Sequence, residues 1–129
     1  MTVYLTKVWG FDAPVGPLAF SFEGWRDRAR KMLRPGDLVL LVGTKSAPTP
    51  EEDQGRLLGM MEPTTEPVMA LDYDLRPRPQ DFDQARRYRW PYGLINLRAW
   101  RFPDHPPLER ISERRFNMDA VQGIAPLTD

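Results

Sequence analysis

The chain contains no cysteine, and only one of its 129 residues is a histidine. The absence of cysteine excludes a disulfide framework, a thiolate zinc site and a cysteine nucleophile, and it is typical of a reducing, cytoplasmic setting. No apolar run approaches the roughly 20 residues needed to span a bilayer, and the N-terminus lacks the features of a signal peptide. We therefore expect no membrane partner.

The chain also lacks net charge, because lysine plus arginine and aspartate plus glutamate both number 18. Bulk charge therefore does not indicate a nucleic-acid partner. Local charge is uneven, with basic segments at 24–34 and 76–89 and an acidic stretch between them. This pattern fits a polar binding face, and it equally fits an ordinary solvated surface.

Residues that support catalysis or metal binding are scarce. His105 lies in a proline-bounded stretch that is typical of a solvated loop, and Asp72 and Asp74 form an isolated Asp-x-Asp pair. The sequence contains neither a glycine-rich phosphate loop nor a serine elbow. We therefore expect no catalytic residues, no metal and no cofactor.

Local patterns predict one helix among several short strands. Residues 2–9 alternate as a strand does, and apolar residues from Trp25 to Leu33 recur at helical spacing, with Arg26 and other cations on the opposite face. Pro35-Gly36-Asp37 ends this helix before a buried strand. Further strands are predicted at 38–42, 56–61, 68–73 and 89–102, and one or two helical turns at 81–87.

These elements predict a single α+β domain over residues 1–129, built around a small, strongly curved sheet or barrel of about five or six strands with helices packed on it. Residues 117–129 are a candidate tail or linker to a further domain.

Aromatic and basic residues are interleaved in the stretch from Arg86 to Tyr92. Stacking of an unpaired base on an aromatic ring contributes about 1 to 3 kcal/mol of binding free energy, while guanidinium groups bind the flanking phosphates. Trp90 follows the arginines and is a candidate exposed ring, whereas Trp9 and Trp25 fit either a pocket wall or the core. The stretch is therefore a candidate nucleic-acid contact, although strand packing also uses tyrosine and tryptophan.

Four segments together resemble the EVE domain of the PUA-like superfamily, which also contains the YTH, ASCH and SRA domains. They are Val3-Tyr4-Leu5-Thr6-Lys7, the helix start Gly24-Trp25-Arg26-Asp27-Arg28-Ala29-Arg30, the turn and strand Leu33-Arg34-Pro35-Gly36-Asp37-Leu38-Val39-Leu40, and Gly55-Arg56-Leu57-Leu58-Gly59-Met60-Met61-Glu62-Pro63. The likeness covers roughly residues 2–102. The Gly-x-Lys-x-x-Glu-x-Arg signature of ASCH domains is missing, which argues against amidohydrolase-type activity.

The resemblance implies a PUA-like β-barrel that accepts a modified base flipped out of DNA or RNA, as in the reader domain of a modification-dependent restriction system with a fused or separate effector domain. The implied base pocket consists of Lys7, Val8, Trp9, Gly10, Trp25, Arg26 and Asn96. The residues expected to hold the nucleic-acid backbone are Arg28, Arg86, Arg87, Arg89 and Trp90.

Two alternatives stay open from the sequence. A small enzyme acting on a modified nucleoside would place Asp12, Glu23 or Asp72 beside Lys7. A protein-interaction module would instead present Trp90 and Tyr92 as an apolar hot spot.

Overall fold

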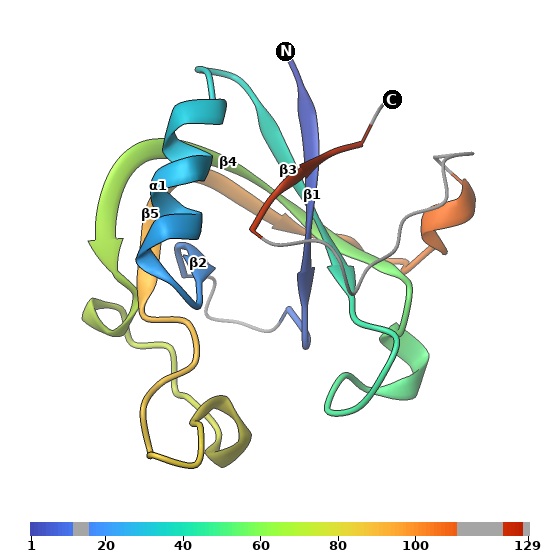
Figure 1. The fold of residues 1–129 in the computed structure, drawn as a ribbon. Coiled ribbons are helices and arrows are strands. Elements are labelled where there is room, and N and C mark those ends of the chain that lie inside the picture. Colours follow the sequence, from blue (N-terminus) through green and yellow to red (C-terminus); the bar gives the residue numbers. More distant parts are fainter. Residues whose placement is uncertain (12–15, 111–122, 128–129) are drawn as a thin grey trace.

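The computed structural model describes residues 1–11, 16–110 and 123–127. This part of the chain forms an α+β domain with a mixed sheet of six strands and one α-helix (Figure 1). The strands and helix are β1 (Val3–Val8), β2 (Leu18–Phe20), α1 (Glu23–Met32), β3 (Leu38–Gly43), β4 (Leu57–Met69), β5 (Tyr92–Arg101) and β6 (Ala125–Pro126). Short 3-10 helices occur at η1 (Glu51–Asp53), η2 (Ala70–Asp72), η3 (Pro79–Asp81) and η4 (Leu108–Arg110).

The hydrogen-bonded strand order is β2-β5-β4-β3-β1-β6. Strands β1 and β3 are parallel, and the remaining neighbours pair antiparallel. Within the described residues β2 and β6 are the two edges, and no pairing between them closes the sheet. The predicted α+β class is therefore confirmed at the level of a mixed sheet with one α-helix.

Strand β3 is apolar throughout because both faces of the sheet are covered at its position. Val39 and Leu41 belong to the core beneath α1, whereas Leu40 and Val42 belong to a second apolar cluster with Leu57. A strand buried on both faces needs a continuous apolar run rather than alternation. The predicted buried strand after the Pro-Gly-Asp turn is confirmed.

Helix α1 packs the predicted apolar face on the sheet. Ala29 and Leu33 are buried in the core, and Trp25 and Met32 pack against it as partly buried side chains. The interpretation of Arg26 as part of the outward basic face is wrong, since this residue is 9% exposed.

The Pro-Gly-Asp turn after α1 has a structural role. Gly36 has φ +89°, a left-handed conformation that glycine adopts without steric cost. The Asp37 carboxylate accepts hydrogen bonds from the backbone N–H groups of Arg34 and Thr2, both at 2.8 Å. The buried carboxylate thus joins the end of the helix to the start of β1.

Strand β4 runs through Pro63 and Pro67, curving past α1 in Figure 1. Within the described residues β3 pairs with β4 as far as Met61, and beyond it β4 pairs with β5 alone. Both prolines therefore lie in the part of β4 that has a partner strand on one side only, where a missing backbone N–H breaks no pairing on the other side. The register with β5 also shifts beside the prolines. The predicted strand at 68–73 is wrong after Met69, because η2 follows.

The segment between β4 and β5 forms a lobe beyond the end of β1 (Figure 1). The prediction of helical turns at 81–87 is wrong, because η3 ends at Asp81 and the chain then makes a turn bridged by Phe82 and Tyr88. Asp83 closes this turn: its backbone N–H donates to the Arg87 carbonyl at 2.8 Å, and its carboxylate accepts the Arg87 N–H at 2.9 Å. These bonds satisfy the backbone without a helix.

Strands β2 and β6 were not predicted from the sequence. Of the candidate tail at 117–129, residues 123–127 are described and place β6 against β1. The rest of that tail lies outside the described residues. No helix in the described ranges is long and apolar enough to cross a membrane.

Candidate functional site

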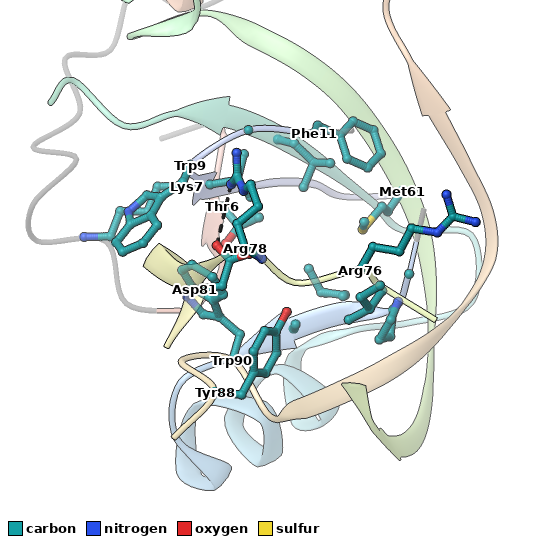
Figure 2. Close-up of a pocket in the computed structure, with 18 residues that line it drawn as sticks. Thr6, Lys7, Trp9, Phe11, Met61, Arg76, Arg78, Asp81, Tyr88 and Trp90 are labelled. Carbon is teal, nitrogen blue, oxygen red and sulfur yellow. Dashed lines mark hydrogen bonds and ion pairs between the residues drawn. The ribbon is translucent and has the colours of Figure 1, made fainter. Parts of the chain in front are cut away.

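A cavity of about 330 Å³ lies between the end of β1 and the lobe that precedes β5 (Figure 2). The end of β1 supplies Thr6 to Trp9, and β3 and β4 supply the apolar side chains of Leu41 and Met61. The remaining walls come from residues 10, 11, 16–19, 75, 76, 78, 81, 88 and 90. Segments that are distant in sequence therefore enclose a single cavity.

Aromatic rings form a continuous series beside this cavity. The rings of Trp9 and Trp90 are 4.8 Å apart between centroids and meet edge to face at 87°. Tyr88 contacts Trp90 at 5.9 Å, and Phe82 contacts Tyr88 at 5.8 Å. Edge-to-face contacts place the positive edge of one ring on the negative face of the next. The series fixes the rings at the cavity wall.

The same wall contains an ion pair between the buried Asp81 and the partly exposed Arg78. Asp81 is 8% exposed, and its Oδ1 lies 3.5 Å from Arg78 Nη2. Asp81 Oδ2 accepts the backbone N–H of Arg78 at 2.8 Å. Figure 2 shows this pair on the wall beside Tyr88, whose hydroxyl group points into the space between the drawn side chains.

The environment of Tyr88 favours its neutral form. Burial raises the pKa of the Tyr88 hydroxyl above the ordinary value of 10.0, and the negative charge of Asp81 raises it further, against a lowering effect of Arg78. The hydroxyl therefore keeps its proton at neutral pH and can donate a hydrogen bond.

A second cavity of about 550 Å³ adjoins the first and shares walls formed by Lys7, Val8, Trp9, Tyr88 and Trp90. Its other side is formed by the start of α1 and by Pro91 and Tyr92 at the start of β5. Trp9 and Trp90 thus contribute to both cavities.

Three of the predicted backbone-binding arginines lie in the lobe. Arg89 lies over the Trp9 ring at 5.2 Å, and its Nε donates to the Gln80 carbonyl at 2.9 Å. Arg87 is exposed and, with Arg89, lines the second cavity. Arg86 is exposed in the adjoining turn, with φ +61°. The fourth, Arg28, is exposed on α1 and lines neither cavity.

The structure brings together only the β1 part of the predicted base pocket. Lys7, Val8, Trp9 and Gly10 line the smaller cavity, and Trp90 lines both. The remaining predicted pocket residues, Trp25, Arg26 and Asn96, line neither cavity.

These three residues have other contacts in the described structure. Trp25 packs against the core beneath α1. Arg26 lies over the Tyr92 ring at 5.5 Å and forms ion pairs with Glu23 at 3.4 Å and Asp27 at 3.5 Å. Asn96 donates from Nδ2 to the carbonyl of Gly16, a cavity residue, at 3.1 Å, and so supports the wall from behind.

Sequence reasoning did not select Asp81, Arg78 or Tyr88 as site residues. Tyr88 lies within the aromatic and basic stretch, so its sequence neighbours were a usable signal. Asp81 is a carboxylate inside a basic segment, where nothing in the sequence distinguishes it as a buried group. The residue Phe11 was also missed; its ring packs against Gly59, where no side chain intervenes.

The structure does not bring the carboxylates that the enzyme alternative names to one site. Glu23 lines the larger cavity together with Lys7, Asp72 lines neither cavity, and Asp12 lies outside the described residues. Among the residues with described placement, no group of three or more potential ligands could hold a metal ion. His105 contacts Asp53 at 2.9 Å, away from both cavities.

Comparison of the chain with protein-family models, curated proteins and solved structures finds no match.

Proposed function

We propose that this protein is a nucleic-acid-binding module that accepts a modified base, flipped out of DNA or RNA, in the cavity beside Trp9 and Trp90. The carrying observation is the composition of that cavity: an edge-to-face tryptophan pair and the ion pair of the buried Asp81 with Arg78 share its wall. Rings provide stacking surfaces for a base, and polar groups select its edge.

The size of the cavity supports a small planar ligand. Its volume of about 330 Å³ is near the lower end of the roughly 300–1,000 Å³ range of ligand sites. Such a volume suits one heterocycle better than a folded peptide segment. Apolar side chains at its base, including Leu41 and Met61, suit the face of a ring or an added methyl group.

The larger cavity suits the chain on either side of the flipped base. Arg87 and Arg89 line it, and Arg86 is exposed in the same turn. Guanidinium groups bind phosphate oxygens with paired hydrogen bonds. Because Trp9 and Trp90 line both cavities, a nucleotide in one site would lie directly beside a nucleotide in the other.

The curved mixed sheet with α1 on one face is compatible with the PUA-like barrel that the EVE resemblance implies. That family assignment, a cytoplasmic location and an effector domain acting with this module are parts of the same proposal.

A binding titration tests the proposal. Labelled DNA duplexes carrying cytosine, methylated cytosine, hydroxymethylated cytosine or methylated adenine, and matching RNAs, are titrated with the protein at two salt concentrations. Preference for one modified base supports a reader and identifies its target. Equal, weak binding to every strand contradicts the proposal for these ligands.

A protein-interaction module remains the second candidate, and one observation favours it. Phe22 is 66% exposed beside the larger cavity, which Trp90 and Tyr92 also line. Exposed aromatic groups of this kind anchor protein interfaces. This alternative predicts partner binding that survives Arg86→Gln with Arg87→Gln and is lost in Phe22→Ser.

A further inference from the structure

Two arginines of the lobe have a backbone conformation that arginine seldom adopts. Among the residues that the structure describes, Arg76 (φ +48°) and Arg86 (φ +61°) are the only ones other than glycine with a positive φ. A side chain crowds the backbone in this left-handed region, so glycine usually occupies it. Arg76 also precedes Pro77, and a residue before proline is ordinarily extended. Glycine at position 76 would therefore suit the turn better than arginine.

Contacts within the described chain do not account for an arginine at position 76. Its ion pair with Asp74 joins Nε to Oδ2 at 3.7 Å, and the two side chains are 79% and 81% exposed. Exposed pairs of this kind add little to stability. The adjoining Leu75 packs against Gly16, and a glycine at position 76 would allow the same turn and the same packing. The Arg76 guanidinium group is therefore not needed to hold the fold.

The position of Arg76 relates it to the ligand site. The residue lines the smaller cavity, and its exposure places it where that cavity opens to solvent. Figure 2 shows it on the opposite side of the cavity from Trp9, with its guanidinium group directed away from that ring. Arg87 and Arg89 line the larger cavity instead. Arginine side chains thus flank the proposed base site on two sides.

We infer that Arg76 binds the phosphate of the flipped nucleotide at the opening of the smaller cavity, and that this arginine is retained for binding although it lowers the stability of the fold. This inference rests on the proposed function and adds a ligand-binding residue to it. A base enclosed beside the tryptophans leaves its sugar and phosphate at the opening, where a guanidinium group can form paired hydrogen bonds with phosphate oxygens. Backbone strain is found at such positions because ligand contact and stability make opposing demands on one residue.

Urea unfolding of the whole chain tests the stability part of the inference. Arg76→Gly relieves the crowding in the left-handed turn, so its unfolding midpoint should equal or exceed that of the wild type. Arg101→Gly is the matched control, because Arg101 is exposed in β5 and has no positive φ. Glycine weakens the interior of a strand, so the midpoint of this control should fall.

Titration at low salt tests the binding part, with the strand from the series above that the wild type binds most tightly. Arg76→Gly should lower the affinity about three- to tenfold, as for one lost hydrogen-bonded contact. Arg76→Asn also tolerates a left-handed turn and should show the same loss without the added flexibility of glycine. Arg76→Lys keeps the charge and should recover part of the affinity. Arg101→Gly, outside both cavities, should bind as the wild type does.

Neutral linkages in the same strand identify the phosphate. A methylphosphonate replaces the phosphate on the 5′ or the 3′ side of the modified nucleotide, which removes one negative charge without changing the base. At one of these two positions the replacement should weaken wild-type binding about three- to tenfold and should have little further effect on Arg76→Gly. Such non-additive losses indicate that the arginine and that phosphate contact each other.

The outcomes separate this inference from the proposed function. Wild-type affinity of folded Arg76→Gly and Arg76→Asn overturns the inference alone, and so do additive losses at both neutral linkages. A lower unfolding midpoint of Arg76→Gly, or its failure to fold, overturns the claim that the arginine lowers stability. Failure of the wild type to bind any strand, modified or unmodified, DNA or RNA, overturns the proposed function and this inference together.

Discussion

The indole rings of Trp9 and Trp90 contact each other edge to face at 4.8 Å, although one lies just after β1 and the other just before β5. Arg89 covers Trp9 at 5.2 Å from its ring centroid. The two indoles therefore hold the end of β1 against the lobe and shape both cavities.

Loss of the Trp9 ring should weaken nucleic-acid binding. For Trp9→Ala we expect about a ten- to hundredfold loss of affinity for the preferred strand, because stacking on an aromatic ring contributes about 1–3 kcal/mol per base. Fluorescence anisotropy at constant salt measures this loss. Trp100→Ala removes an indole outside both cavities and should retain the affinity. Equal affinity of folded Trp9→Ala and wild type would show that the ring does not contact the ligand.

Neutralising the exposed turn should reduce the salt dependence of binding. Arg86→Gln with Arg87→Gln removes two exposed charges, so the slope of log affinity against log salt should become shallower by roughly 0.7 per lost contact on single strands, or 0.9 on duplexes. Titrations at several salt concentrations give the slope. Arg101→Gln, at an exposed site that lines neither cavity, serves as the control. An unchanged slope in the double variant would place the phosphates elsewhere.

The raised pKa of Tyr88 should make part of the folding stability pH dependent. The unfolded chain releases this proton near pH 10, while burial and Asp81 hold it in the folded protein. The contribution is therefore fully present below about pH 10 and is lost as the pH rises through the folded-state pKa. Urea unfolding between about pH 8 and pH 11 should show a steeper loss for wild type than for Tyr88→Phe. Parallel curves would contradict the assignment.

Two glycine substitutions should change stability in opposite directions. At Gly59 a Cβ would collide with the Phe11 ring and the Trp100 carbonyl oxygen, so Gly59→Ala should cost about 1–3 kcal/mol of unfolding free energy. At Gly24, within α1, a Cβ meets nothing within 4 Å, and Gly24→Ala should add about 0.4–1 kcal/mol. Chemical unfolding measures both. A neutral Gly59→Ala would contradict this packing, because both the Phe11 ring and the β5 backbone at Trp100 would have to move without cost.

Local patterns in the sequence determined the elements around the first half of the sheet. Alternation placed β1, helical spacing placed Trp25, Ala29 and Leu33 on one face of α1, and Pro35-Gly36-Asp37 ended that helix. Trp9 at the end of β1 was also visible in the sequence as a candidate pocket wall, whereas Lys7, Val8 and Gly10 were expected from the family resemblance alone. Such features are predictable because each depends on neighbours a few residues away.

The tertiary structure alone decided the other features. Strands β2 and β6 have three and two residues, too few to produce a periodic signal, and they exist by pairing with β5 and β1. The prolines of β4 are tolerated because that half of the strand has a partner on one side. Asp81 becomes a buried cavity group, and Trp9 meets Trp90, because the lobe folds back over the end of β1. Local sequence signals which residues prefer burial, but pairing between distant segments decides which of them meet.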